Sequence, residues 1–175
     1  TIETGGNVGA GTTGPSALFA IENTGTGHSF YVNDSASDAT PCVINANGAV
    51  GIGTAKPSRF IGLTTPKMEI VDEDGTASDL ALRTAGGALG RPIIFLANSD
   101  GTVDAPALGA SGDDFGKLTF SGYDGADFEP GAEVRGSIDG TPGLDDMPGR
   151  LVFLTTPDGT VTLEERLRIT NAGFV

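Results

Sequence analysis

Hydrophobic and polar residues alternate with a period of two along most of the chain, which predicts short β-strands separated by turns. The apolar pairs of these strands are Phe19/Ile21, Phe30/Val32, Val43/Ile44, Val50/Ile52, Met68/Ile70, Leu80/Leu82, Leu118/Phe120, Val134/Ile138, Leu151/Phe153 and Leu167/Ile169. The continuous apolar run 93–96 predicts a strand buried on both faces. Only 163–167 also fits one helical turn, and it fits a strand equally well. The pattern therefore predicts an all-β fold.

Turn residues separate the predicted strands. The loop 23–27 predicts a hairpin between its two flanking strands, and Asn47-Gly48 is a favoured two-residue turn. The acidic stretch 72–75 leads from Met68/Ile70 toward Leu80/Leu82. Later turn signals lie at 100–101, 123–125, 139–143, 148–149 and 157–159.

A short motif is repeated. Val8-Gly9-Ala10-Gly11 recurs as Val50-Gly51-Ile52-Gly53, and Gly173-Phe174-Val175 matches the start of a third copy. Because glycine within a strand costs about 0.5–1 kcal/mol relative to alanine, the alternation favours a second backbone packed closely on the bare face. A three-chain axis or a tightly wound ribbon would use such a face, and a flexible glycine loop is the alternative. The residues predicted to lie at an oligomer interface are Val8, Gly9, Gly11, Val50, Gly51, Ile52, Gly53, Leu167 and Ile169.

Composition indicates a core that is small for the chain length. Of 175 residues, 28 are Gly and 10 are Pro, and 38% are hydrophobic. A composition shift near Pro57-Ser58 divides a Gly-rich β shaft or collar segment, 1–58, from a β-rich module, 59–175. The first segment is too small to fold alone. We expect an elongated, turn-rich β-sandwich or interwoven β ribbons that complete their core with a partner.

The net charge of −13 excludes some partners. Polyanions are repelled, so we expect neither nucleic acid nor an anionic membrane surface as a partner. No stretch approaches the ~20 apolar residues of a membrane span. The start at Thr1 without Met and the apolar end suggest cuts through a longer polypeptide or processed termini.

Candidate chemistry is sparse. Residues 9–14 match G-x-G-x-x-G, but the β pattern resumes within about ten residues, where a dinucleotide site needs a long helix. Cys42 and His28 are the only thiol and the only imidazole of the sequence. Cys42 begins a predicted apolar strand, where a free cysteine behaves as a small hydrophobic residue. Carboxylate pairs could hydrolyse a glycosidic bond or bind Ca²⁺, although solvated acidic turns are the ordinary interpretation. We therefore predict neither enzymatic activity, nor a metal site, nor a cofactor.

Four charged residues near the C-terminus lie in the last predicted strand. Alternation places Glu164, Arg166 and Arg168 on the face opposite Leu167 and Ile169. Ion pairs there could set the register between strands or chains, and solvation of an outer face is the alternative.

The stretch 118–175 resembles the repeated β modules of bacteriophage tail fibres and related virion appendages. The matching blocks are Leu118-Thr119-Phe120-Ser121-Gly122-Tyr123-Asp124-Gly125, residues 139–143, residues 146–153, Thr155-Thr156-Pro157-Asp158-Gly159, residues 165–170 and residues 173–175. In such fibres the last block runs on into Val-Gly-Ile-Gly-Thr and a Pro, which residues 50–58 contain.

The resemblance implies a homotrimeric, elongated, non-catalytic appendage outside the cell, on the virion tail. Its partners would be copies of itself, other virion tail proteins and a host surface glycan or outer-membrane protein. One alternative is a subunit of a cellular surface filament or adhesin, and another is a polysaccharide-cleaving tailspike.

Overall fold

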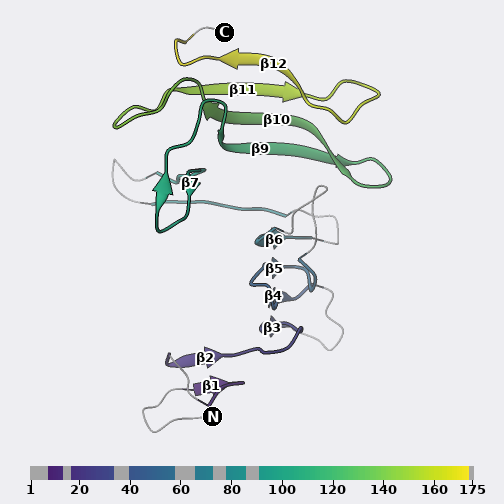
Figure 1. Ribbon diagram of the computed structural model, residues 1–175. Coiled ribbons are helices and arrows are strands. Elements are labelled where there is room, and N and C mark those ends of the chain that lie inside the picture. Colours follow the sequence, from purple (N-terminus) through teal and green to yellow (C-terminus); the bar gives the residue numbers. More distant parts are fainter. Residues whose placement is uncertain are drawn as a thin grey trace. The chain divides into compact units, whose positions relative to one another are not determined.

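The computed structural model describes residues 8–13, 17–33, 40–57, 66–72, 78–85 and 91–173, and these residues form strands, turns and no helix (Figure 1). The strands are β1 (Val8–Ala10), β2 (Phe19–Ile21), β3 (Phe30–Val32), β4 (Cys42–Ile44), β5 (Val50–Ile52), β6 (Met68–Ile70), β7 (Asp100–Gly101), β8 (Pro106–Ala107), β9 (Asp114–Tyr123), β10 (Phe128–Ile138), β11 (Gly149–Thr155) and β12 (Glu164–Ile169). The prediction of an all-β fold is confirmed. None of the described residues belongs to a helix able to cross a membrane.

The chain forms two compact units, Thr1–Ala81 and Leu82–Val175. In the first unit β1 pairs with β2, and a second sheet has the order β3-β4-β5-β6. In the second unit β7 pairs with β8, and a four-stranded sheet has the order β12-β11-β10-β9. The predicted boundary near position 58 falls between β5 and β6, and these two strands pair with each other.

The two copies of the Val-Gly-x-Gly motif fold in the same way. Each copy forms a strand that pairs in parallel with the next strand of its sheet, β1 with β2 and β5 with β6. The last glycine of each copy has a positive φ, +78° at Gly11 and +77° at Gly53. A Cβ at Gly11 would collide with the carbonyl oxygen of Glu22, and one at Gly53 with that of Val71. Glycine is therefore required at both positions for two reasons: the backbone has a positive φ, and a side chain would have no room.

The turn between β4 and β5 is a hairpin, as predicted, but it is one residue longer than the predicted two-residue turn. Asn45 N donates to Ala49 O at 3.0 Å, and Gly48 N donates to Asn45 O at 3.0 Å. Gly48 has φ +73°. This is the three-residue loop in which a turn is followed by a left-handed glycine.

One predicted hairpin and one predicted strand are wrong. β2 and β3 belong to different sheets, β2 beside β1 and β3 beside β4. In the loop between them the Asn23 side chain donates to Gly27 O at 2.7 Å and accepts from Gly25 N at 2.9 Å. β6 pairs in parallel with β5, and Leu80 and Leu82 lie outside any strand. Most of the predicted turn at 72–75 lies outside the described residues.

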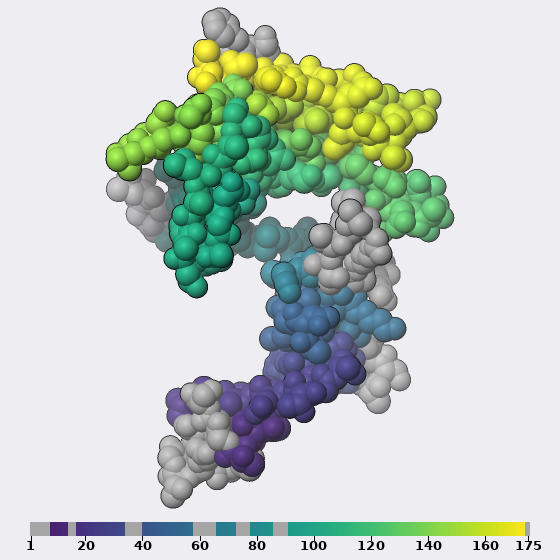
Figure 2. Space-filling view, in the orientation of Figure 1, coloured from purple at the N-terminus to yellow at the C-terminus, as the bar shows by residue number. Residues whose placement is uncertain are grey.

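The sheet β9–β12 is a meander of antiparallel neighbours, and its four strands are those that the sequence predicts. The Asp124 carboxylate accepts from Ala126 N at 2.8 Å and Asp127 N at 2.9 Å, which closes the β9–β10 turn. The prediction of a buried strand at 93–96 is wrong, because these residues have no strand partner and are exposed. The short β7–β8 hairpin was not predicted, and it projects from its unit as the teal arm of Figure 2.

The core of the described chain is small. The buried apolar side chains among the described residues are Val43, Ala49, Ile138, Val152 and Leu154, together with the rings of Pro41 and Pro57. Most large apolar side chains remain exposed. Since burial of apolar area gives roughly 25 cal/mol per Å², much of the hydrophobic stabilisation available to these residues is unused within one chain.

Candidate subunit interface

One face of the sheet β9–β12 is apolar and largely uncovered. The strand register places on this face, called the apolar face below, Leu118, Phe120, Val134, Leu151, Phe153, Leu167 and Ile169. Phe120 is 60% exposed and Leu118 is 53% exposed. Contiguous exposed apolar side chains of this kind mark interaction surfaces. Leu167 and Ile169, which the sequence placed at an interface, lie on it.

The chain itself covers one end of the apolar face. A Cβ at Gly116 would lie 2.6 Å from the Cβ of Leu96, and a Cβ at Gly149 would lie 3.4 Å from the ring of Phe115. The absence of side chains at these glycines leaves room for Leu96 and Phe115 to pack on the sheet. The same covering does not reach Phe120, which stays exposed.

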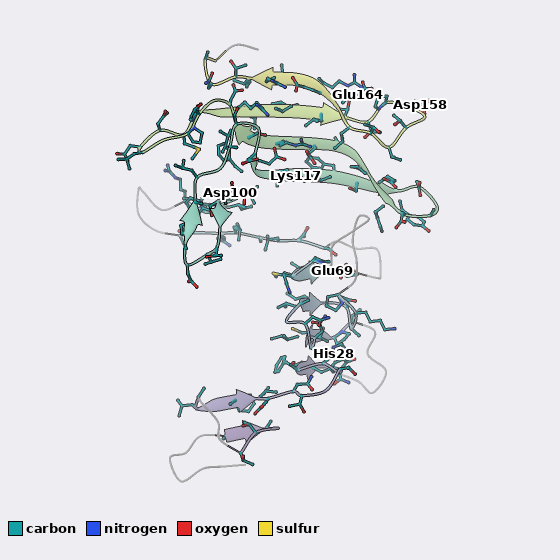
Figure 3. All side chains as sticks on the ribbon, viewed as in Figure 1. His28, Glu69, Asp100, Lys117, Asp158 and Glu164 are labelled. Carbon is teal, nitrogen blue, oxygen red and sulfur yellow. The ribbon has the colours of Figure 1, made fainter. Side chains whose placement is uncertain are left out.

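The opposite face of the sheet carries charge, and its central carboxylate is buried. Glu133 on β10 is 2% exposed. Arg135 forms an ion pair with it and donates from Nε at 2.6 Å. Lys117 Nζ lies 3.2 Å from the carboxylate, and Thr119 Oγ1 donates to it at 3.1 Å. Figure 3 shows Lys117 on β9 within this sheet.

The surroundings of Glu133 shift its acidity. Burial by itself raises the pKa of the carboxyl, and the hydrogen bonds from Arg135, Lys117 and Thr119 lower it by more, so that the pKa lies below its ordinary value. The carboxylate therefore stays charged at neutral pH, and it holds two cations on this face.

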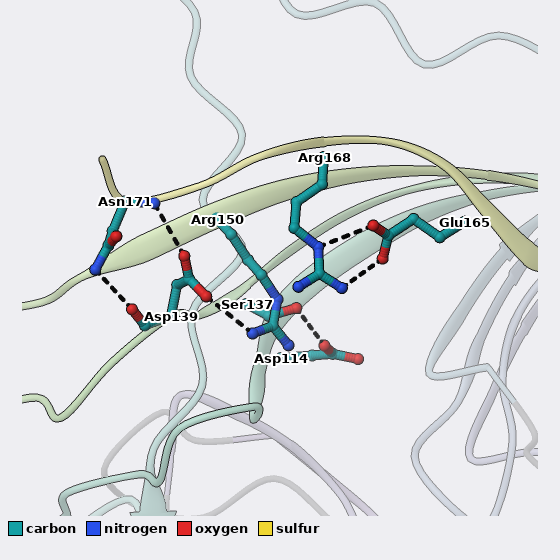
Figure 4. A network of polar contacts seen from close by, with 7 residues as sticks. All are labelled: Asp114, Ser137, Asp139, Arg150, Glu165, Arg168 and Asn171. Atoms are coloured by element: carbon teal, nitrogen blue, oxygen red, sulfur yellow. Dashed lines mark hydrogen bonds and ion pairs between the residues drawn. The ribbon is translucent and has the colours of Figure 1, made fainter. Parts of the chain in front are cut away.

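A second polar network joins β9, β10, β11 and the chain after β12 (Figure 4). Arg150 Nη1 lies 3.2 Å from the Asp139 carboxylate, which also accepts from Asn171 N at 3.0 Å. Ser137 Oγ donates to Asp114 at 2.6 Å. The hydrogen bond from Asn171 N, together with that from Arg150, lowers the pKa of Asp139 against the raising effect of burial. These contacts tie the end of β12 to the end of β10.

The predicted arrangement of charges on β12 is wrong in one respect. Arg168 pairs with Glu165 at 2.6 Å, whereas Arg166 pairs with Glu164 at 3.1 Å and donates to Thr155 Oγ1 at 2.8 Å. A register shift between β11 and β12 near Phe153 interrupts the alternation. The extra residue at such a bulge ends the simple two-residue period, so the two arginines do not share one face.

The first unit also has an outward apolar surface. Val50 and Ile52 flank the buried Gly51 on β5 and point away from it. Val8 on β1 is 38% exposed. These three side chains were predicted to lie at an interface, and each is at least partly open to contact.

Three glycines of the repeated motif, Gly11, Gly51 and Gly53, face atoms of the chain itself. A Cβ at Gly51 would lie 2.7 Å from Thr54 O and 2.9 Å from Cγ of Pro57. At Gly51 the predicted close approach to the bare face of the strand is therefore made by the same chain, as in a wound ribbon. That Gly9, Gly11, Gly51 and Gly53 lie at an interface with another copy of the chain stays a prediction.

The residues considered for catalysis or metal binding are not assembled into a site in the described parts of the chain. His28 lies against Tyr31, with ring centres 5.3 Å apart. Cys42 is exposed in β4, opposite Val32 and Ile52. Within the described ranges no three His, Cys, Asp or Glu side chains gather as metal ligands would.

A hollow of about 750 Å³ lies between the β9–β10 turn and the β11–β12 connection. Its lining includes Tyr123, Asp124, Glu129, Thr156 and Val161. Asp124 accepts from the backbone of its own turn, and Thr156 Oγ1 donates to Pro130 O at 2.5 Å. Both polar groups therefore serve the fold.

Comparison with known proteins identifies a fold. No family model matches the sequence, and no curated protein matches it. Among solved structures, the chain is similar to the carboxy-terminal domain of the bacteriophage T5 L-shaped tail fibre, with a TM-score of 0.59 and 19% sequence identity. The likeness covers 82% of this chain and 62% of that chain, so this chain spans less than two thirds of its neighbour. The protein thus has an all-β fold like that of a phage tail-fibre domain.

Proposed function

We propose that this chain is a non-catalytic structural segment of a homotrimeric phage tail fibre. In this role it belongs to a virion tail appendage outside the cell. It associates with copies of itself and with other virion tail proteins. The fibre that it helps to build supports attachment to a host surface glycan or outer-membrane protein.

The apolar face of β9–β12 is the observation that carries this proposal. Its seven side chains are uncharged and most of them are exposed, whereas Lys117, Glu133 and Arg135 on the opposite face are joined in ion pairs. A sheet normally buries one face against another layer. In a fibre subunit the missing layer is supplied by neighbouring copies. The likeness to a tail-fibre domain adds support at the level of the fold.

The test is the oligomeric state in solution. Sedimentation equilibrium over a dilution series should give three times the 17.6 kDa mass of the chain. Phe120→Asp introduces a charge on the apolar face and should shift the protein toward monomer. Thr141→Asp adds the same charge in an exposed loop of the same unit and should leave the mass unchanged. A folded wild-type monomer at all concentrations would overturn the proposal.

A further inference from the structure

Each strand of the sheet β3–β6 is three residues long, and the pairing aligns the four strands in three rows. The middle row includes Val43, which is fully buried, and Gly51, which is also buried. Because neighbouring residues of a strand point to opposite faces, the other two rows share the second face. This outer face consists of Phe30, Val32, Cys42, Ile44, Val50, Ile52, Met68 and Ile70.

The two faces of this sheet differ in what covers them. On the inner face Pro57 fills the space above Gly51 of β5. Pro41 and Ala49, which directly precede β4 and β5, are buried, as is Pro57. On the outer face Met68 is 54% exposed and Val32 is 50% exposed. The chain thus closes a small core around Val43 and Gly51 on the inner face, which also carries Tyr31 and Glu69 in the outer strands of the sheet. It leaves eight uncharged side chains, most of them exposed, on the other face.

Charge indicates which partner can cover the outer face. None of its eight residues is charged, in a chain whose net charge is −13. Two copies repel one another wherever acidic surfaces meet, and this repulsion is weakest where both surfaces are uncharged and apolar. The second unit likewise leaves one apolar face exposed, so the chain carries an uncharged apolar surface in each unit. A second copy of this chain presents both.

We propose that the outer face of β3–β6 packs against the same face of other copies, strand level by strand level, so that Cys42 of one copy meets Cys42 of another. This inference rests on the proposed function and names a surface for it. In a closed symmetric assembly about an axis that runs along the stack of strands, each strand lies level with its own counterparts. Strands are spaced about 4.8 Å apart, so a slip by one strand would leave an apolar strand uncovered at each end.

Cys42 makes this arrangement measurable, since it is the only cysteine of the chain. It lies between Val32 and Ile52 in one row of the outer face. The wild-type protein is oxidised with diamide and separated by non-reducing denaturing electrophoresis. A covalent dimer is expected, because a disulfide forms when two cysteine Cα atoms come within about 7 Å. In a trimer one pair forms and the third thiol stays free, so about two thirds of the chains should enter the dimer.

Matched variants control for collisions between exposed thiols. Cys42→Ser should form no dimer. Asn47→Cys in the Cys42→Ser background moves the thiol to the exposed β4–β5 turn, and it should react with a bulky maleimide about tenfold faster than Cys42. Ile52→Asp places a carboxylate beside Cys42 and should abolish the dimer, whereas Asn47→Asp should preserve it.

The outcomes separate this inference from the proposed function. An oligomer of the expected mass that forms no Cys42 dimer overturns the inference and leaves the proposed function standing. A dimer that forms equally well from Asn47→Cys also overturns the inference, since random collision then explains it. A monomeric wild-type protein overturns the proposed function first.

Discussion

Arg135 and Glu133 lie two residues apart on β10, and the guanidinium of the first holds the buried carboxylate of the second. Side chains two residues apart in a strand share a face. The strand β10 by itself therefore brings Glu133 and Arg135 together. Lys117 and Thr119 of β9 then complete the cluster across the strand. The cluster thereby compensates the buried charge on the face that also carries the buried Val152 and Leu154, opposite the apolar face.

Removing the buried charge should destabilise the second unit. Glu133→Gln keeps the shape of the side chain but leaves Lys117 without its anion and Arg135 with only the longer contact to Asp114. We expect the free energy of unfolding to fall by about 1–3 kcal/mol. Urea unfolding monitored by circular dichroism measures this change. Glu164→Gln breaks a solvent-exposed ion pair with Arg166 and should change the free energy by less than about 0.5 kcal/mol. Equal effects of the two substitutions would argue against the buried cluster.

Acid should weaken the second unit. The pKa values of Glu133, Asp139 and Glu165 all lie below their ordinary values. The unfolded chain therefore binds protons more readily than the folded chain. The stability from these carboxylates is fully present above about pH 4.5 and is lost as the pH falls through the lower folded pKa values.

The urea midpoint, followed from about pH 7 to about pH 3, tests this expectation. It should fall at the acid end, and the fall should be shallower in Asp139→Asn, which no longer titrates at the Arg150 and Asn171 contacts. A midpoint that does not change with pH would contradict the assignment.

The left-handed glycine of the repeated motif should tolerate no side chain. Gly53→Ala brings a Cβ onto the carbonyl oxygen of Val71 in addition to the cost of a positive φ. Gly48→Ala has the same kind of φ with open space around it and should cost about 1–2 kcal/mol. Gly53→Ala should cost more than that. Gly27→Ala, with neither constraint, should change the free energy of unfolding by less than about 1 kcal/mol.

These three variants are compared by urea unfolding at one protein concentration. The expected order of destabilisation is Gly53→Ala, then Gly48→Ala, then Gly27→Ala. If Gly53→Ala is no worse than Gly48→Ala, the close approach to Val71 does not constrain the fold.

Salt should strengthen self-association. Each copy brings a net charge of −13, and the proposed contacts are apolar, so screening removes repulsion without removing attraction. The dissociation constant from sedimentation should therefore decrease as sodium chloride rises from about 0.05 M to about 0.5 M. An increase would mean that ion pairs between copies dominate the interface.

Local pattern predicted much of this structure. The alternation in Leu118/Phe120 and Leu151/Phe153 was enough to predict β9 and β11, because strand faces follow from a two-residue period. The all-β class and the hairpin at Asn47-Gly48 also followed from nearby residues. The sequence indicated too that the core of one chain is small, since composition limits how many bulky side chains can be buried.

Tertiary structure alone decided the partners of the strands and the neighbours of the side chains. The parallel pairing of β5 with β6 depends on which distant strand returns beside Gly53, and no local signal contains that choice. The bulge near Phe153 moved Arg166 away from the face of Arg168, because one extra residue changes the side of every residue beyond it. The ion pair of Glu133 with Lys117 likewise joins two neighbouring strands. These features arise from contacts between residues far apart in the chain, and only the folded chain brings such residues together.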